Sequence, residues 1–252
     1  MSTEGQQLLA SVDYDNKTDV VKLVSKLRSA GHEPGLVAAV LTQAKLRKRA
    51  EAKFGEFAAR MLFTEAGLEQ SSRLTVAAQH AGRFRIAGVG SVADLGCGIG
   101  AESLAFAAAG LDVKAFELDE VTAAVATYNL LPFDNAEVKQ ADVTQLDYST
   151  SAPAEALFFD PARRELGGPK RATTVRKFDP DEFSPNFDWV VERCQAAGAA
   201  AAGIIPLSMA WIGDQVAYDR RQETLAKLMG YTVSGMMAGL WFGGFAAEHL
   251  GW

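Results

Sequence analysis

The sequence predicts an α/β fold in which a parallel sheet follows an N-terminal helical subdomain, and three observations support this interpretation. The first 85 residues are rich in strong helix formers. After Gly90, short apolar runs alternate with helical stretches, which is typical of βαβ units. A glycine-rich turn follows the first apolar run. We therefore expect a helical subdomain over residues 1–85 and a second domain over residues 86–252, with the assignment from about residue 206 left open.

The composition is that of a globular protein, with 48% apolar and 22% charged residues in 252. The sequence lacks an uninterrupted apolar run of about 18 residues and a basic-then-apolar N-terminus, so we expect a cytoplasmic protein without a membrane segment. Cys97 and Cys194 are far apart and the histidines are scattered, which predicts neither a disulfide framework nor a metal site. The oligomeric state is left open.

Charge is distributed unevenly around the net value of −6. Residues 1–85 carry 13 Lys and Arg against 9 Asp and Glu, whereas residues 86–252 carry 12 against 22. An acidic total argues against a protein that coats nucleic acid without specificity, although local basic patches can still bind phosphate.

Three helices are predicted before residue 85, each with a signal for its start or end. The first begins near Val20 and ends at Gly31. The second covers residues 36–62 with a break at Gly55. Ser72 is the expected cap of a third helix that extends to about residue 81.

The second half is predicted to alternate strands with helices. The predicted strands are 91–95, 112–117, 137–140, 156–159 and 200–205, with an antiparallel pair at 231–234 and 239–242. The predicted helices are 102–109, 120–128, 187–196 and 219–229.

The turn at residues 94–100, Asp-Leu-Gly-Cys-Gly-Ile-Gly, lies between a predicted strand and a predicted helix. Gly96, Gly98 and Gly100 allow the backbone to turn sharply and to approach a ligand that a Cβ would obstruct. Glycines also serve plain strand-to-helix turns. The spacing differs from G-x-G-x-x-G because the third glycine comes one residue early, which argues against a nicotinamide oxidoreductase.

Acidic residues stand at the ends of the next three strands. Glu117 ends the second strand 21 residues after Gly96, where a carboxylate can accept both hydroxyls of a ribose. Asp142 follows the third strand and could bind an adenine edge, or simply form a turn. Asp160 and Pro161 end the fourth strand, at the edge where open α/β sheets bind ligands.

This series of elements resembles the class I S-adenosylmethionine-dependent methyltransferases over about residues 90–205. The resemblance implies a Rossmann-like sheet of about seven strands. It also implies that S-adenosylmethionine is the cofactor, with Glu117 on the ribose and Asp142 on the adenine. The implied cofactor-binding residues are Asp94, Gly96, Cys97, Gly98, Gly100, Glu117 and Asp142.

Further motifs resemble the bacterial methyltransferases that carry a THUMP-like domain. They are Leu-Arg-Lys-Arg at 46–49, Lys-Phe-Gly at 53–55, Met-Leu-Phe-Thr at 61–64, Gly-Leu-Glu-Gln at 67–70 and Asp-Pro-Ala-Arg-Arg at 160–164. A more distant likeness, at residues 67–81, is to the trimethylguanosine synthase group, which methylates a guanine amine. Both resemblances imply an RNA substrate. Residues 196–238 match the THUMP-like pattern poorly, so we do not expect a complete THUMP-like domain.

The resemblance favours methylation of a base nitrogen, with Asp160 and the Pro161 carbonyl as the catalytic groups that orient the amine. Amine-directed relatives carry Asp/Asn-Pro-Pro-aromatic, whereas Ala162 and Arg163 stand here in the last two positions. That departure keeps three alternatives open. They are a degenerate protein that binds cofactor or RNA without catalysis, a small-molecule methyltransferase and a protein methyltransferase.

Residues 163–177 form a predicted basic loop in an otherwise acidic half, with six basic residues against Glu165. Such a loop is either solvated surface or a contact for an RNA backbone. The candidate substrate-binding residues are Arg163, Arg164, Lys170 and Arg171.

Two other features are expected to be ordinary surface. The basic cluster at residues 45–53 lies on a predicted helix, where its spacing favours a solvent face over a nucleic-acid contact. His80 is expected to be an ordinary helical residue and not a base.

Overall fold

The computed structural model describes residues 2–15, 17–146, 154–160, 164–166, 174–176, 185, 188–190 and 192–193, of which 164–166 and 174–176 as backbone alone. They all belong to the first of two units, Met1–Ala202. The strands predicted after residue 200, the helix 219–229 and most of the helix 187–196 lie outside these residues. So do Pro161, Arg163, Lys170 and Arg171. None of the helices described has the length and apolar character needed to cross a membrane.

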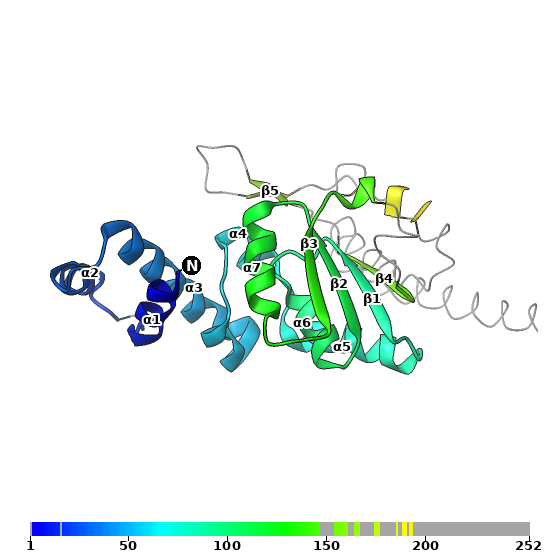
Figure 1. The fold of residues 1–252 in the computed structure, drawn as a ribbon, viewed down its shortest axis with the longest axis horizontal. Coiled ribbons are helices and arrows are strands. Elements are labelled where there is room, and N and C mark those ends of the chain that lie inside the picture. The colour runs from blue at the N-terminus through cyan, green and yellow to red at the C-terminus, as the bar shows by residue number, and fades with distance from the viewer. Residues whose placement is uncertain are drawn as a thin grey trace, which may run out of the picture. The chain divides into compact units, whose positions relative to one another are not determined.

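The chain begins with three helices, α1 (Thr3–Ser11), α2 (Val20–Ser29) and α3 (Pro34–Phe54) (Figure 1). Asp19 caps α2 by accepting the Lys22 amide, and Pro34 occupies the first turn of α3, where its missing N–H costs nothing. The three helices share a small core. It consists of Leu8, Leu9, Leu27, Val37, Val40, Leu41, Ala44 and Leu62.

The break predicted at Gly55 is confirmed, because α3 ends there and a 3-10 helix, Gly55–Arg60, follows. Next come α4 (Glu65–Gln70) and α5 (Leu74–Ile86). The prediction that Ser72 caps a helix ending near residue 81 is wrong. Arg73 occupies the N-cap of α5, where the described residues provide no side-chain cap, and the helix continues five residues further. Gly82 does not end it, since a single glycine within a packed helix is tolerated.

The second half forms a parallel sheet with helices between its strands. Its elements are β1 (Ser91–Leu95), α6 (Ala101–Ala108), β2 (Asp112–Glu117), α7 (Glu120–Leu130), β3 (Ala136–Gln140), the 3-10 helix η2 (Val143–Gln145) and β4 (Ala156–Phe159). The four strands have the order β3-β2-β1-β4 (Figure 1). This is the strand order of a Rossmann-like sheet, so the predicted α/β class is confirmed for the described residues.

Parallel pairing brings the carboxyl ends of the four strands to one edge. Leu95 of β1 lies opposite Phe116 of β2 and Phe159 of β4, and Glu117 of β2 lies opposite Gln140 of β3. The residues that follow these positions therefore begin side by side. All four residues of β4 are buried, as expected for a strand covered on both faces.

The main core joins the helices before residue 86 to the sheet. Aromatic rings run through it, with centroids 5.4 Å apart for Phe54 and Phe63, 5.4 Å for Phe84 and Phe106, and 5.2 Å for Phe106 and Phe158. A second cluster, around Leu95, Phe116 and Phe159, lies apart from this core. The sheet and the helices α4 and α5 thus depend on the same buried surface.

The predicted loop at residues 163–177 contains two short strands, β5 (Arg164–Leu166) and β6 (Thr174–Arg176), so the prediction of a plain loop is wrong. They pair antiparallel, with Arg164 opposite Arg176. The prediction for this segment rested on its basic side chains, and charge alone does not determine whether a backbone forms strands.

Candidate functional site

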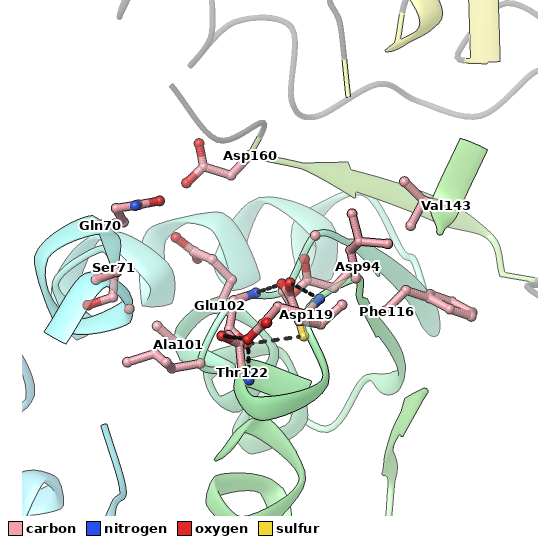
Figure 2. Close-up of a pocket in the computed structure, with 18 of the residues that line it drawn as sticks. Gln70, Ser71, Asp94, Ala101, Glu102, Phe116, Asp119, Thr122, Val143 and Asp160 are labelled. Carbon is pink, nitrogen blue, oxygen red and sulfur yellow. Dashed lines mark hydrogen bonds between the residues drawn. The ribbon is translucent and has the colours of Figure 1, made fainter. Parts of the chain in front are cut away.

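A pocket of about 780 Å³ opens at the carboxyl edge of the sheet (Figure 2). Its volume is within the range of small-ligand sites. The structure brings together on its wall seven of the predicted site residues: Asp94, Gly96, Cys97, Gly98, Glu117, Asp142 and Asp160. Gly100 is the N-cap of α6 and is not among the described lining residues. Arg164 begins β5, and its side chain is outside the described part of the structure.

The glycine turn requires backbone conformations that other residues rarely adopt. The φ angles of Gly96, Gly98 and Gly100 are 105°, 56° and 84°, all in the left-handed region. The amides of Gly96 and Cys97 both donate to the carbonyl of Phe116, at 3.0 and 2.9 Å. A Cβ built on Gly96 or Gly98 would meet no described atom within 4 Å, so the turn presents bare backbone to the pocket.

Glu117 connects the glycine turn to the turn that follows β2. Its Oε2 accepts the Gly98 amide at 2.9 Å and its Oε1 accepts the Asp119 amide at 3.0 Å. A carboxylate has about four lone-pair positions. Glu117 can therefore hold both turns and still accept two hydroxyls from a ligand.

Asp142 forms a turn and lines the pocket at once. Its Oδ1 accepts the backbone amide of Thr144 at 2.9 Å and the Thr144 hydroxyl at 2.7 Å. The turn-forming alternative is therefore observed, and Oδ2 is the oxygen outside these two bonds. The side chain stands beside Val143 on the pocket wall.

Asp94 lies at the base of the turn and is almost inaccessible, with 1% exposure. The Ser103 hydroxyl donates to its Oδ2 at 2.5 Å. Burial raises the pKa of Asp94 to about 8, although the Ser103 hydrogen bond lowers it. Charges on Glu102, Asp160 and Glu117 add smaller increases. Asp94 therefore keeps its proton at neutral pH and supports the turn as a neutral group.

Cys97 is also buried, and its Sγ lies 3.6 Å from the carbonyl oxygen of Gly98. Burial raises the pKa of the thiol well above its ordinary value. A thiol that stays protonated is a poor nucleophile. Cys97 thus fits a packing role in the turn.

Sequence reasoning missed one lining residue, Glu102 of α6, and its contact with His80 of α5. The His80 Nδ1 lies 3.1 Å from the Glu102 Oε2, and the His80 ring packs against Phe158 at a centroid distance of 5.3 Å. His80 lies within α5, as predicted, and it also contacts a carboxyl group of the pocket wall. The available signal was a lone glutamate in the otherwise uncharged stretch Ala101–Ala108.

The pocket wall is strongly acidic. Besides the neutral Asp94, its carboxyl groups are those of Glu69, Glu102, Glu117, Asp119, Glu120, Asp142 and Asp160. Among the described lining residues there is no Lys or Arg. Such a wall favours ligands that are cationic or donate hydrogen bonds, and it disfavours phosphate.

The basic cluster at residues 45–53 departs from the predicted solvent face at two positions. The Arg47 Nε donates to the Met61 carbonyl at 2.8 Å. The Lys53 Nζ donates to the carbonyls of Leu68, Glu69 and Ser71 at 2.7, 2.8 and 2.7 Å. The end of α4 leaves carbonyls without helical partners, and these attract the lysine. Both side chains are therefore structural ties within the chain.

Comparisons with known proteins give one family match and several structural likenesses. Residues 1–50 match a domain of unknown function, DUF8688. No curated protein matches the chain significantly.

Three solved structures are similar to parts of the chain. The N-terminal domain of EvdMO1 with SAH bound is 23% identical, covers 45% of this chain and 52% of its own, and has a TM-score of 0.33. A protein of Pyrococcus horikoshii, provisionally named an RNA methyltransferase, is 22% identical, covers 47% of this chain and 59% of its own, and has a TM-score of 0.36. A protein of Porphyromonas gingivalis W83, provisionally named a methyltransferase, is 21% identical, covers 64% of this chain and 40% of its own, and has a TM-score of 0.43. The chain thus spans less than two thirds of each of these structures.

Gly67 allows α4 to approach the glycine turn, and we expect Gly67→Ala to destabilise the protein. An added Cβ would lie 2.3 Å from Ile99 Cγ2 and 2.7 Å from Thr64 Oγ1. Overpacking of this kind costs about 1–3 kcal/mol. Gly82→Ala is the matched control, because no described atom lies within 4 Å of its new Cβ and alanine favours a helix by about 0.5–1 kcal/mol. Urea denaturation measures both, and equal stabilities would contradict the close approach.

Asp94 should make stability depend on pH. The folded protein holds at Asp94 a proton that the unfolded chain releases near pH 3.8, since the folded pKa is about 8. The resulting stabilisation is full below the lower value and is lost as the pH rises to about 8. We expect the melting temperature of the wild type to fall more steeply across this range than that of Asp94→Asn. Parallel profiles would show that Asp94 ionises normally.

Proposed function

We propose that the chain is a methyltransferase that uses S-adenosylmethionine and methylates RNA at a base nitrogen, in the cytoplasm. S-adenosylmethionine is the cofactor. The observation that carries the proposal is that the glycine turn, Glu117, Asp142 and Asp160 line a single pocket. Of the three similar structures, two are named as methyltransferases and the third, EvdMO1, was crystallised with SAH.

The residues present fit the cofactor part by part. Glu117 has lone pairs left for the two ribose hydroxyls. Asp142 and the exposed apolar residue Leu118 line the same pocket, and together they suit the edge and face of an adenine. Bare backbone at Gly96 and Gly98 leaves room for the amino-acid end. The acidic wall suits a sulfonium cation.

The bound cofactor supplies an electrophilic methyl group. Asp160, directly after β4, accepts an N–H of the acceptor amine and turns the nitrogen lone pair toward that methyl. Methyl transfer would leave the acceptor nitrogen with one extra proton. The extra proton on nitrogen passes to the Asp160 carboxylate and then to water, and the backbone carbonyl of Pro161 completes the amine site.

The RNA part of the proposal rests on the basic segment after Asp160. Phosphate is disfavoured along the acidic wall, so the RNA backbone needs a separate cationic surface. Arg163, Arg164, Lys170 and Arg171 follow the catalytic dipeptide closely enough in sequence to supply it. The resemblance of the motifs at residues 46–70 and 160–164 to RNA-directed families supports the same substrate.

Isothermal titration with S-adenosylmethionine and S-adenosylhomocysteine tests the cofactor site. We expect micromolar binding by the wild type and at least a tenfold loss in Gly98→Asp and Glu117→Ala. The first change puts a side chain and a negative charge on a left-handed glycine, and the second removes the ribose acceptor. Glu137→Ala, on the exposed face of β3, is the control. Undiminished binding in both site variants would overturn the assignment.

Asp160→Ala tests the acceptor site. We expect transfer of labelled methyl to total RNA to fall about a hundredfold, the usual scale for loss of a positioned acid–base group. The dissociation constant of S-adenosylhomocysteine should stay unchanged. Full transfer by the variant would remove Asp160 from the mechanism. A wild type that binds cofactor and methylates no RNA would favour the non-catalytic or small-molecule alternatives.

A further inference from the structure

Glu102 is an unusual residue for its position. It is the single charged residue of α6, and only 6% of it is exposed. Burying a carboxyl group in apolar surroundings is costly unless hydrogen bonds replace the lost water. The surrounding contacts should therefore satisfy both of its oxygens if its role is structural.

The contacts around Glu102 satisfy only one of its two carboxyl oxygens. Oε2 lies 3.1 Å from the His80 Nδ1, whereas the buried Oε1 has no hydrogen-bond partner among the described residues. Other buried polar side chains nearby are bonded, since Ser103 pairs with Asp94, and Asn129 bonds to Leu62 and Ile99. A buried acceptor without a donor costs about 1–3 kcal/mol, so its retention calls for a functional explanation.

Glu102 belongs to the wall of the cofactor pocket, on the side of Asp160, and its unpartnered oxygen is buried beside that wall. Glu102 lies in the first turn after the glycine turn, and Asp160 directly follows β4, the strand next to β1. In Figure 2 the Glu102 side chain extends from α6 toward the part of the pocket where Asp160 and Gln70 lie.

We propose that Glu102 is a second acceptor-binding carboxyl group, which with Asp160 selects an amino group carrying two N–H bonds. This inference rests on the proposed function and narrows its acceptor to an exocyclic amine of a nucleobase. Asp160 and the Pro161 carbonyl share one hydrogen, Oε1 of Glu102 accepts the other, and the lone pair is left to face the methyl group. A hydroxyl or a ring nitrogen cannot supply two donors.

His80 is the positioning residue in this arrangement. Its Nδ1 fixes one oxygen of Glu102, and its ring is held against Phe158. The Glu102 backbone is fixed by α6 and its Oε2 is fixed by His80, and together these two restraints determine the direction of Oε1. Pre-organisation of this kind keeps the acceptor nitrogen in line with the methyl group.

Sinefungin and S-adenosylhomocysteine together give a test that does not require the RNA substrate. Sinefungin carries an ammonium group where the cofactor carries its methyl, so it presents N–H donors to the acceptor end. Calorimetry on the full chain compares the two dissociation constants for the wild type, Glu102→Gln, Glu102→Asp and the exposed control Glu137→Gln. We expect Glu102→Gln to weaken sinefungin about tenfold, as for loss of one charge-assisted hydrogen bond, without affecting S-adenosylhomocysteine.

The same variants separate a binding role from a structural role. Glu102→Gln should melt at or above the wild-type temperature, because it removes an incompletely bonded buried carboxyl group. A lower melting temperature, or failure to fold, would show that the carboxyl group serves the fold and would overturn the proposal. Glu102→Asp keeps the negative charge but moves it away by one methylene. If this variant bound sinefungin as tightly as the wild type, the effect of Glu102 would be that of its charge at a distance, and the proposed direct contact would be wrong.

Two further results complete the test. An unchanged ratio of the two dissociation constants in Glu102→Gln would overturn the role of Glu102 while leaving the cofactor site intact. A wild type that binds neither ligand would instead overturn the proposed function. In methylated RNA, nucleoside mass spectrometry should find the label on an exocyclic amine, and label on a ring nitrogen, a ribose oxygen or carbon would contradict the narrowed acceptor.

Discussion

The left-handed turn from β1 into α6 is the constraint on which the rest of the pocket depends. Its backbone is held from the pocket side by Glu117, which accepts the Gly98 amide. From below, Asn129 of α7 donates to the Ile99 carbonyl at 2.9 Å, and it also bonds to both the amide and the carbonyl of Leu62. One buried amide thus fixes the glycine turn relative to α7 and to the segment before α4. Side chains alone could not position the turn, since its glycines have none.

Charge is divided in this protein between two kinds of task. Acidic side chains gather at the pocket, and the most buried of them, Asp94, avoids repulsion by keeping its proton. Basic side chains on α3 act as ties, because Lys53 and Arg47 donate to carbonyls that helices and turns leave unpaired.

Local patterns predicted most of the described sheet, whereas contacts between elements could not be predicted. Strands such as Ala156–Phe159 were found at their predicted bounds because a buried parallel strand is a short apolar run with turn residues at its ends. The cap at Ser72 was wrong because a capping residue type does not by itself fix where a helix begins. The bond between His80 and Glu102 joins residues 22 apart on packed helices, and no spacing within one helix encodes it.

The core shared by α5 and the sheet bears on where the chain can be divided. Phe84 packs on Phe106, and Phe106 packs on Phe158, so the ring stack crosses residue 85 without interruption. A fragment that began at residue 86 would expose this aromatic surface to water and would tend to aggregate. The helices over residues 1–44 have a small core of their own, to which Leu62 also contributes. A fragment that retains the pocket should therefore begin before Leu46, and the cooperative unit of unfolding includes the helices that precede the sheet.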